Sequence, residues 1–166
     1  MRPPNILNSE PQIAVKHDIE QIEQVQRKFT KRLPGLKMYS YAVRLSKLDV
    51  PSLELRRLHM DLILCYKIVF GLIDVKFDDF FQLSTVVTTR GHPFKLFKKY
   101  SDVNARKSFF SQRIINVWNS IPSDTVDFST LRSFKRTVKV VNFSQFLKCF
   151  SLDHIVLHCV CMYVDV

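Results

Sequence analysis

Four possible zinc ligands lie close together near the end of the chain: His154, His158, Cys159 and Cys161. Histidine nitrogens and cysteine thiolates are ligands that zinc prefers, and structural zinc sites draw pairs of them from two separate elements. Here three of the four fall within residues 158–161, and no loop separates a second pair. We therefore expect no metal site. A small zinc-binding protein that uses this tail remains an alternative.

Paired carboxylates occur in the stretch KFDDFF, residues 76–81. In polymerase palms, two aspartates behind an aromatic residue hold catalytic metal ions. That motif places its aromatic residue two positions before the first aspartate, where this chain has Lys76. No second acidic motif lies upstream to complete a two-metal site. We interpret the stretch as a short acidic-aromatic turn or helix, anchored by Phe80 or Phe81.

No residue stands in a context that would activate it for catalysis. Cys65 belongs to an apolar helical stripe, where a cysteine usually acts as a small hydrophobic residue, and His59 lies on another face. No serine or cysteine occupies a nucleophile turn. With 3 glycines, the chain contains neither of the glycine-rich phosphate-binding motifs. We therefore expect no catalytic residue, no cofactor and no small-molecule substrate.

Positive charge is the strongest compositional signal. The net charge is +10, and it concentrates in residues 27–37, 86–113 and 129–139, of which the first and third contain no acidic residue. Such blocks attract polyanions, most commonly the phosphate backbones of nucleic acids. The alternative is that these blocks are solvated helix faces that only keep the protein soluble.

Residues 88–122 combine this charge with aromatic side chains. Lysines and arginines neutralise phosphates, and exposed aromatic rings stack on unpaired bases, each stack contributing roughly 1–3 kcal/mol. Alternatively, Phe94, Leu96 and Phe97 pin the segment to the helices while the lysines point outward. Trp118, the only tryptophan, has helical spacing and is expected in the core. His92 either contacts a phosphate or has an ordinary role in a turn.

Helical periodicity accounts for most of the chain. Apolar residues recur every three or four positions from Ile19 to Leu33, and Pro34 and Gly35 end this helix. Ser40 caps a short helix that runs to Leu48. Pro51 and Ser52 open the central core helix, which Gly71 ends.

The second half contains an irregular segment followed by two more helices. Residues 84–100 lack a helical period and contain Pro93, so we expect an extended arm or a loose hairpin that pivots at Gly91. Ser108 is the expected cap of a helix that ends before Pro122, and Ser129 caps the last helix. The predicted fold is mostly α: a small helical bundle with an irregular basic arm or short β-hairpin inserted between two helical halves.

Four cysteines without an apolar leader segment are typical of reduced intracellular thiols. The apolar tail from Ile155 to Val164 is much shorter than the roughly 20 residues that a membrane span requires. We expect a soluble protein of the cytoplasm or nucleus that does not associate with membranes.

Several segments together resemble a known family. They are IEQIEQVQRKFTKRLPGL, YAVRLSKLDVPSLELRRLHMDLILCYKIVFGL, TTRGHPFKLF, RKSFFSQRIINVWNSIPSDTV and SFKRTV, in that order. They are similar to the C-terminal, post-palm region of reverse transcriptases from non-LTR retrotransposons (LINE-like, jockey-type). The resemblance covers about residues 13–150 and begins within the end of the helical thumb.

The resemblance implies a helical thumb and C-terminal module that grips template-primer or element RNA by its backbone. Neither the palm aspartates nor the endonuclease carboxylates have counterparts, so it implies a fragment of an RNA-directed DNA polymerase that is not itself an enzyme. Expected partners are RNA or DNA backbones and the missing palm and thumb. From charge we infer the backbone contacts, which are Arg27, Lys28, Lys31, Arg32, Arg90, Lys95, Lys98, Lys99, Arg106, Lys107 and Arg113.

The predicted organisation has three parts: an unstructured lead-in over residues 1–12, the helical module over residues 13–150 and an unmatched apolar tail over residues 151–166. The unmatched ends suggest a degenerate copy or a clipped reading frame. In that case, the surface on which the missing thumb helices packed would be apolar and exposed. A helical interaction module without any nucleic-acid role remains the main alternative function.

Overall fold

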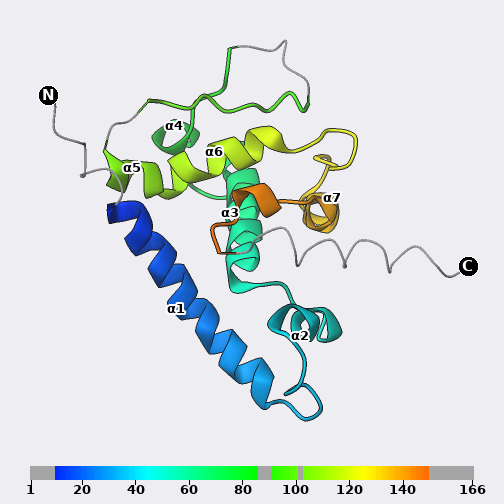
Figure 1. Ribbon diagram of the computed structural model, residues 1–166. Coiled ribbons are helices and arrows are strands. Elements are labelled where there is room, and N and C mark those ends of the chain that lie inside the picture. Colours follow the sequence, from blue (N-terminus) through cyan, green and yellow to red (C-terminus); the bar gives the residue numbers. More distant parts are fainter. Residues whose placement is uncertain (1–9, 86–90, 101–102, 150–166) are drawn as a thin grey trace, which may run out of the picture. The chain divides into compact units, whose positions relative to one another are not determined.

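The computed structural model describes residues 10–85, 91–100 and 103–149, and this part of the chain is mostly helical, which confirms the predicted fold class (Figure 1). It contains no strand beyond one isolated bridge. The elements are α1 (Glu10–Arg32), α2 (Tyr41–Lys47), α3 (Leu53–Val69), α4 (Phe77–Phe80), α5 (Asn104–Ser108), α6 (Phe110–Ser120), α7 (Leu131–Thr137) and two 3-10 turns, Val138–Val140 and Ser144–Phe146.

The chain divides into two compact units. Unit 1 comprises the described residues up to Arg56 together with those from Ser144 onward, and unit 2 comprises Arg57–Phe143. The predicted division into a lead-in, one module and a tail remains a prediction. One boundary differs, since α1 already begins at Glu10, within the expected lead-in.

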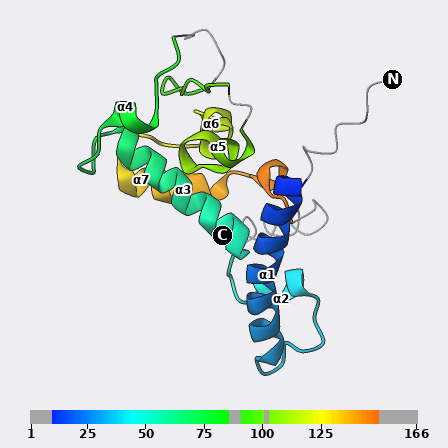
Figure 2. The ribbon, with the colours of Figure 1, turned by 90° about the vertical axis from the view of Figure 1, so that its left-hand side faces the viewer.

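Polar contacts join α1 to its neighbours in unit 1, where α1 and α2 lie side by side (Figure 2). The buried carboxylate of Glu23 accepts a hydrogen bond from the Tyr41 hydroxyl and one of 3.0 Å from the backbone N–H of Leu53, the first residue of α3. Arg44 of α2 is also buried, and its Nε donates to the Thr30 hydroxyl at 3.1 Å. Glu23 therefore links three helices through one side chain.

The apolar stripe expected on α1 does not form the core of unit 1. Ile22, Val25 and Phe29 are 57%, 67% and 63% exposed, whereas Glu23 and Thr30 are buried. The packed face of α1 is the one that carries Glu23 and Thr30, because their hydrogen bonds to α2 and α3 satisfy polar groups that would otherwise be costly to bury.

The central helix α3 begins and ends as expected. The Ser52 hydroxyl accepts from the Leu55 N–H at 3.2 Å, and Gly71 follows the helix with a φ of 63°. This left-handed conformation is the one glycine adopts readily after a helix. Near the start of α3, the Glu54 carboxylate accepts from the backbone N–H groups of Lys148 and Cys149 at 2.6 and 3.1 Å.

An aromatic core fills unit 2. Leu62, Cys65 and Tyr66 of α3 are buried, as are Trp118 of α6 and Phe134 of α7. The rings of Tyr66 and Phe134 stack at 4.5 Å between centroids, in agreement with the side-by-side placement of α3 and α7 in Figure 2. Trp118 is completely buried, so the prediction that it belongs to the core is confirmed.

The irregular arm is present and is fixed to α6. Leu83 and Leu96 form one antiparallel bridge, and residues 86–90 at the tip lie outside the described residues. The side-chain amide of Asn119 accepts from the Leu96 N–H at 2.9 Å and donates to the Leu96 carbonyl at 2.8 Å, as a neighbouring strand would. The Trp118 indole N–H donates to the Phe94 carbonyl at 2.6 Å.

Two helix caps lie one residue later than expected. Ser108 ends α5 instead of starting α6, and the N-cap of α6 is Phe109, which has no capping side chain. The last helix is capped by Thr130, whose hydroxyl accepts from the Ser133 N–H at 3.1 Å. Ser129 is one residue too early, because the Asp127 carboxylate binds its N–H in a local turn.

Candidate nucleic-acid interface

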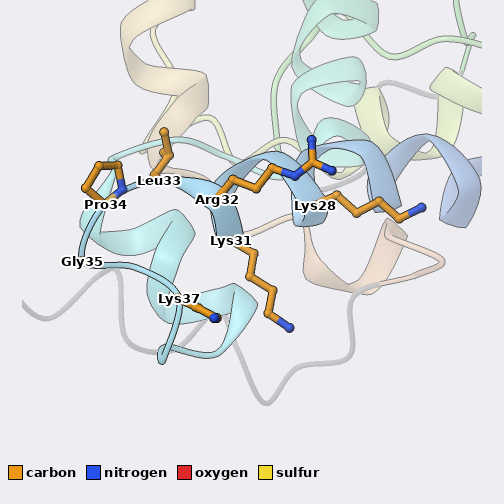
Figure 3. A pocket seen from close by; sticks show the side chains of 7 residues that line it. All are labelled: Lys28, Lys31, Arg32, Leu33, Pro34, Gly35 and Lys37. Atoms are coloured by element: carbon orange, nitrogen blue, oxygen red, sulfur yellow. The ribbon is translucent and has the colours of Figure 1, made fainter.

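The most concentrated positive charge in unit 1 surrounds the end of α1. We call this the basic pocket; it has a volume of about 590 Å³ and is lined by Lys28, Lys31, Arg32, Leu33, Pro34, Gly35 and Lys37 (Figure 3). Its four cationic side chains are exposed, and no acidic residue lines it. A hollow with four cations and no carboxylate is suited to bind an anion such as phosphate.

Backbone geometry explains why these cations gather. After Arg32 the chain turns back, with a hydrogen bond of 3.2 Å from the Leu36 N–H to the Leu33 carbonyl and a φ of 75° at Gly35. This turn brings Lys37 back toward the last turn of α1. Lys31 and Lys37 extend to the same side of the turn, whereas Arg32 extends to the opposite side (Figure 3).

Part of this charge also has a structural role. Lys31 and Arg32 lie in the last turn of α1, where cations offset the negative end of the helix dipole. Lys37 lies beyond the helix, so this role does not explain it. Lys37 was not among the predicted contacts, although it ends the acid-free window 27–37.

In unit 2 the lysines of the arm differ in their surroundings. The Lys95 ammonium donates to the Asn119 carbonyl, and partial burial lowers its pKa. Lys98 and Lys99 are exposed and form no ion pair among the described residues. The structure thus gives Lys95 an internal partner and leaves Lys98 and Lys99 accessible to a ligand.

Two aromatic side chains flank the accessible lysines. Phe97 is 49% exposed and Tyr100 is 89% exposed, so each presents ring surface to solvent next to a cation. Phe97 therefore does not pin the arm to the helices, whereas Leu96 is buried and the Phe94 ring lies 4.8 Å from that of Phe70. The sequence FKKY at residues 97–100 therefore combines charge with stackable rings.

Arg113 has a structural partner. Its guanidinium donates to both carboxylate oxygens of Asp61, with Nη2 at 2.9 Å from Oδ1 and Nε at 3.1 Å from Oδ2. Its Nη1 donates to the Ser108 carbonyl at 3.1 Å. This bidentate, partly buried pair joins α6 to α3 and engages the donors that a phosphate would need.

The other predicted contacts have different surroundings. Arg27 is exposed, with its guanidinium 4.9 Å from the centroid of the Tyr41 ring. Arg106 and Lys107 are exposed on α5. Arg90 lies outside the described residues. The basic residues Arg132, Lys135 and Arg136 of α7 and Lys139 of the following 3-10 turn are exposed as well.

His92 faces the core of unit 2. It is buried, and its Nε2–H donates to the Trp118 carbonyl at 2.8 Å. Its ring lies 4.8 Å from that of Phe128. Burial lowers the pKa of His92 and also that of His59, which favours the neutral form of both imidazoles.

The remaining candidates for catalysis or metal binding that lie within the described residues are Cys65 and the KFDDFF stretch, and both have structural roles. Cys65 is buried, which raises its pKa and suppresses the thiolate. KFDDFF contains the short helix α4, followed by the buried anchor Phe81. Among residues 10–85, 91–100 and 103–149, no cluster of three metal-ligating side chains occurs. The tail residues His154, His158, Cys159 and Cys161 lie outside the described residues.

No helix in the described part of the chain is long and apolar enough to cross a membrane. In comparisons with known proteins, the chain matches no family model, no curated protein and no solved structure.

Proposed function

We propose that this chain binds RNA or RNA–DNA hybrid through the phosphate backbone, as the helical post-palm region of a non-LTR retrotransposon reverse transcriptase. The observation that carries the binding proposal is the basic pocket, with four exposed cations and no acidic residue in its lining. Such contacts neutralise phosphates and do not read base edges, so binding should depend little on sequence.

The arm supports the same function within unit 2. Lys98 and Lys99 supply charge, and Phe97 and Tyr100 supply ring surface on which unpaired bases can stack. The clamp of Asn119 on Leu96 holds the preceding backbone in place, so these four side chains project from a fixed segment. Single-stranded RNA is therefore the ligand that fits the arm best.

The test is the salt dependence of binding, measured by fluorescence anisotropy with labelled single-stranded RNA and RNA–DNA hybrid. Each phosphate contact contributes about 0.7 to the slope of log affinity against log salt for single strands, and about 0.9 for duplex. Replacing Lys28, Lys31 and Lys37 by glutamine should reduce the magnitude of the slope by about 2–3.

The matched control removes three cations elsewhere: Arg132 and Lys135 of α7 and Lys139 of the following 3-10 turn, all exposed. If this variant and the pocket variant lose the same slope, net charge alone explains the binding and the pocket proposal is wrong. A second variant, with Lys98 and Lys99 replaced by glutamine, tests the arm. Lys95 is left intact because its ammonium holds the Asn119 carbonyl.

The family origin has a separate test. Transcripts that carry this reading frame can be sequenced upstream of the segment IEQIEQVQRKFTK. An in-frame palm with an aromatic-x-Asp-Asp motif would support the proposal. An upstream frame that encodes an unrelated domain would contradict it, and the binding measurements would then stand alone.

A further inference from the structure

Helix α1 presents an apolar surface to solvent. Ile22, Val25 and Phe29, spaced three and four residues apart, are each more than half exposed. Residues at this spacing share one face of a helix, so the three side chains form a continuous stripe two turns long. Large apolar side chains grouped in this way on one face mark a site of protein association.

Charged residues continue this stripe at both ends. Asp18 lies four residues before Ile22, and Arg32 lies three residues after Phe29. The full series alternates steps of four and three, which is the spacing of the buried seam of a coiled coil. Asp18 and Arg32 are exposed, and neither forms an ion pair among the described residues.

We propose that this seam pairs with the seam of a second copy of the chain, with the two α1 helices antiparallel and the two-fold axis near Val25. Asp18 and Arg32 are each seven residues from Val25, or about 10 Å along the helix axis. An antiparallel pair brings Asp18 of each copy toward Arg32 of the other. A parallel pair would instead place like charges together, which disfavours it.

The direction of the C-terminal chain favours a second copy over residues 150–166 as the occupant of the seam. The Cys149 thiol donates to the Lys16 carbonyl at 3.7 Å. Burial raises the pKa of Cys149, and so do the nearby carboxylates of Glu54, Glu20 and Glu23. Glu20 and Glu23 lie on the side of α1 away from Val25, so the described chain ends on the face opposite the seam.

The first experiment measures the mass of the full-length chain over a range of concentrations by sedimentation equilibrium, without nucleic acid. The wild type should approach the dimer mass as concentration rises. Val25→Glu should raise the dissociation constant at least about tenfold. The substitution buries a carboxylate at the two-fold axis, where it faces the same carboxylate of the second copy. Gln24→Glu adds the same charge at an exposed neighbouring position outside the seam and should leave association unchanged.

A charge exchange then tests the antiparallel arrangement. Asp18→Arg alone and Arg32→Asp alone should each weaken association, since each places like charges together across the axis. The double variant, D18R with R32D, restores opposite charges in both pairs and should recover association. Circular dichroism checks that all variants retain the helical content of the wild type.

Two results would overturn the proposal. The first is a wild-type chain that stays monomeric at every concentration, which would assign the seam to a different partner. The second is a double variant that associates no better than the two single variants, because the charges would then not face each other. Arg32 also lines the basic pocket, so these experiments are made without nucleic acid and binding by the Arg32 variants is measured separately.

Discussion

Two arginines of the basic window 86–113, Arg106 and Arg113, have different roles in this protein. Arg106 on α5 is exposed, whereas Arg113 on α6 is engaged by the Asp61 carboxylate and the Ser108 carbonyl. The sequence predicts both as backbone contacts, because charge is visible in it and the partner of Arg113, 52 residues away, is not. The same holds for Lys95 and Lys98: Lys95 donates to the carbonyl of Asn119, a distant partner that the sequence does not reveal, whereas Lys98 is exposed.

We expect Arg113→Gln to destabilise unit 2 by about 1–3 kcal/mol, because it leaves the partly buried Asp61 carboxylate without its bidentate donor. Its effect on the salt slope of RNA binding should be negligible. Chemical denaturation followed by Trp118 fluorescence measures the stability. Arg106→Gln is the control and should leave the free energy of unfolding within about 0.5 kcal/mol. The reverse pattern would make Arg113 the ligand contact.

At the scale of elements, the sequence predicts helices better than it predicts which faces they bury. Both ends of α3 are predicted correctly, because Ser52 at its start and Gly71 after its end are local signals. The sequence does not show which face of α1 is buried. An apolar stripe normally identifies the core side, but here the partners of Glu23 lie 18 and 30 residues away, on Tyr41 and Leu53.

Glu23 therefore allows a test of how unit 1 is held together. Glu23→Gln keeps the size of the side chain but loses the charge that strengthens the hydrogen bonds from Tyr41 and Leu53, so we expect a loss of about 1–3 kcal/mol. Thermal unfolding followed by far-UV circular dichroism measures it. Glu20→Gln changes an exposed side chain one turn earlier and should cost less than about 0.5 kcal/mol. Equal losses would show that the buried contacts are unimportant.

At the scale of the whole molecule, the two units should respond differently to acid. His59 and His92 both belong to unit 2, and burial lowers the pKa of each below the ordinary value of 6.5. Below that value the unfolded chain takes up protons that the folded chain does not. The stability of unit 2 should therefore fall with decreasing pH, by up to about 1.4 kcal/mol per pH unit for each histidine.

Trp118, the chain's only tryptophan, reports on unit 2 alone. Its fluorescence should show a lower unfolding midpoint at pH 5.5 than at pH 7.5, a pH range set by the ordinary histidine pKa of about 6.5. Replacing His59 and His92 by glutamine should remove most of the difference, whereas His17→Gln, on the exposed part of α1, should not. A midpoint that does not change with pH would contradict the neutral, buried state of the two imidazoles.

Glu54 has a consequence for synthesis on the ribosome. Its carboxylate binds the N–H groups of Lys148 and Cys149, so unit 1 joins residues separated by 94 and 95 positions. Unit 2, in contrast, is one continuous segment that is complete once Phe143 has been added. During translation, unit 2 can therefore fold as soon as it leaves the exit tunnel, whereas the start of α3 waits for its last partners until Cys149 emerges.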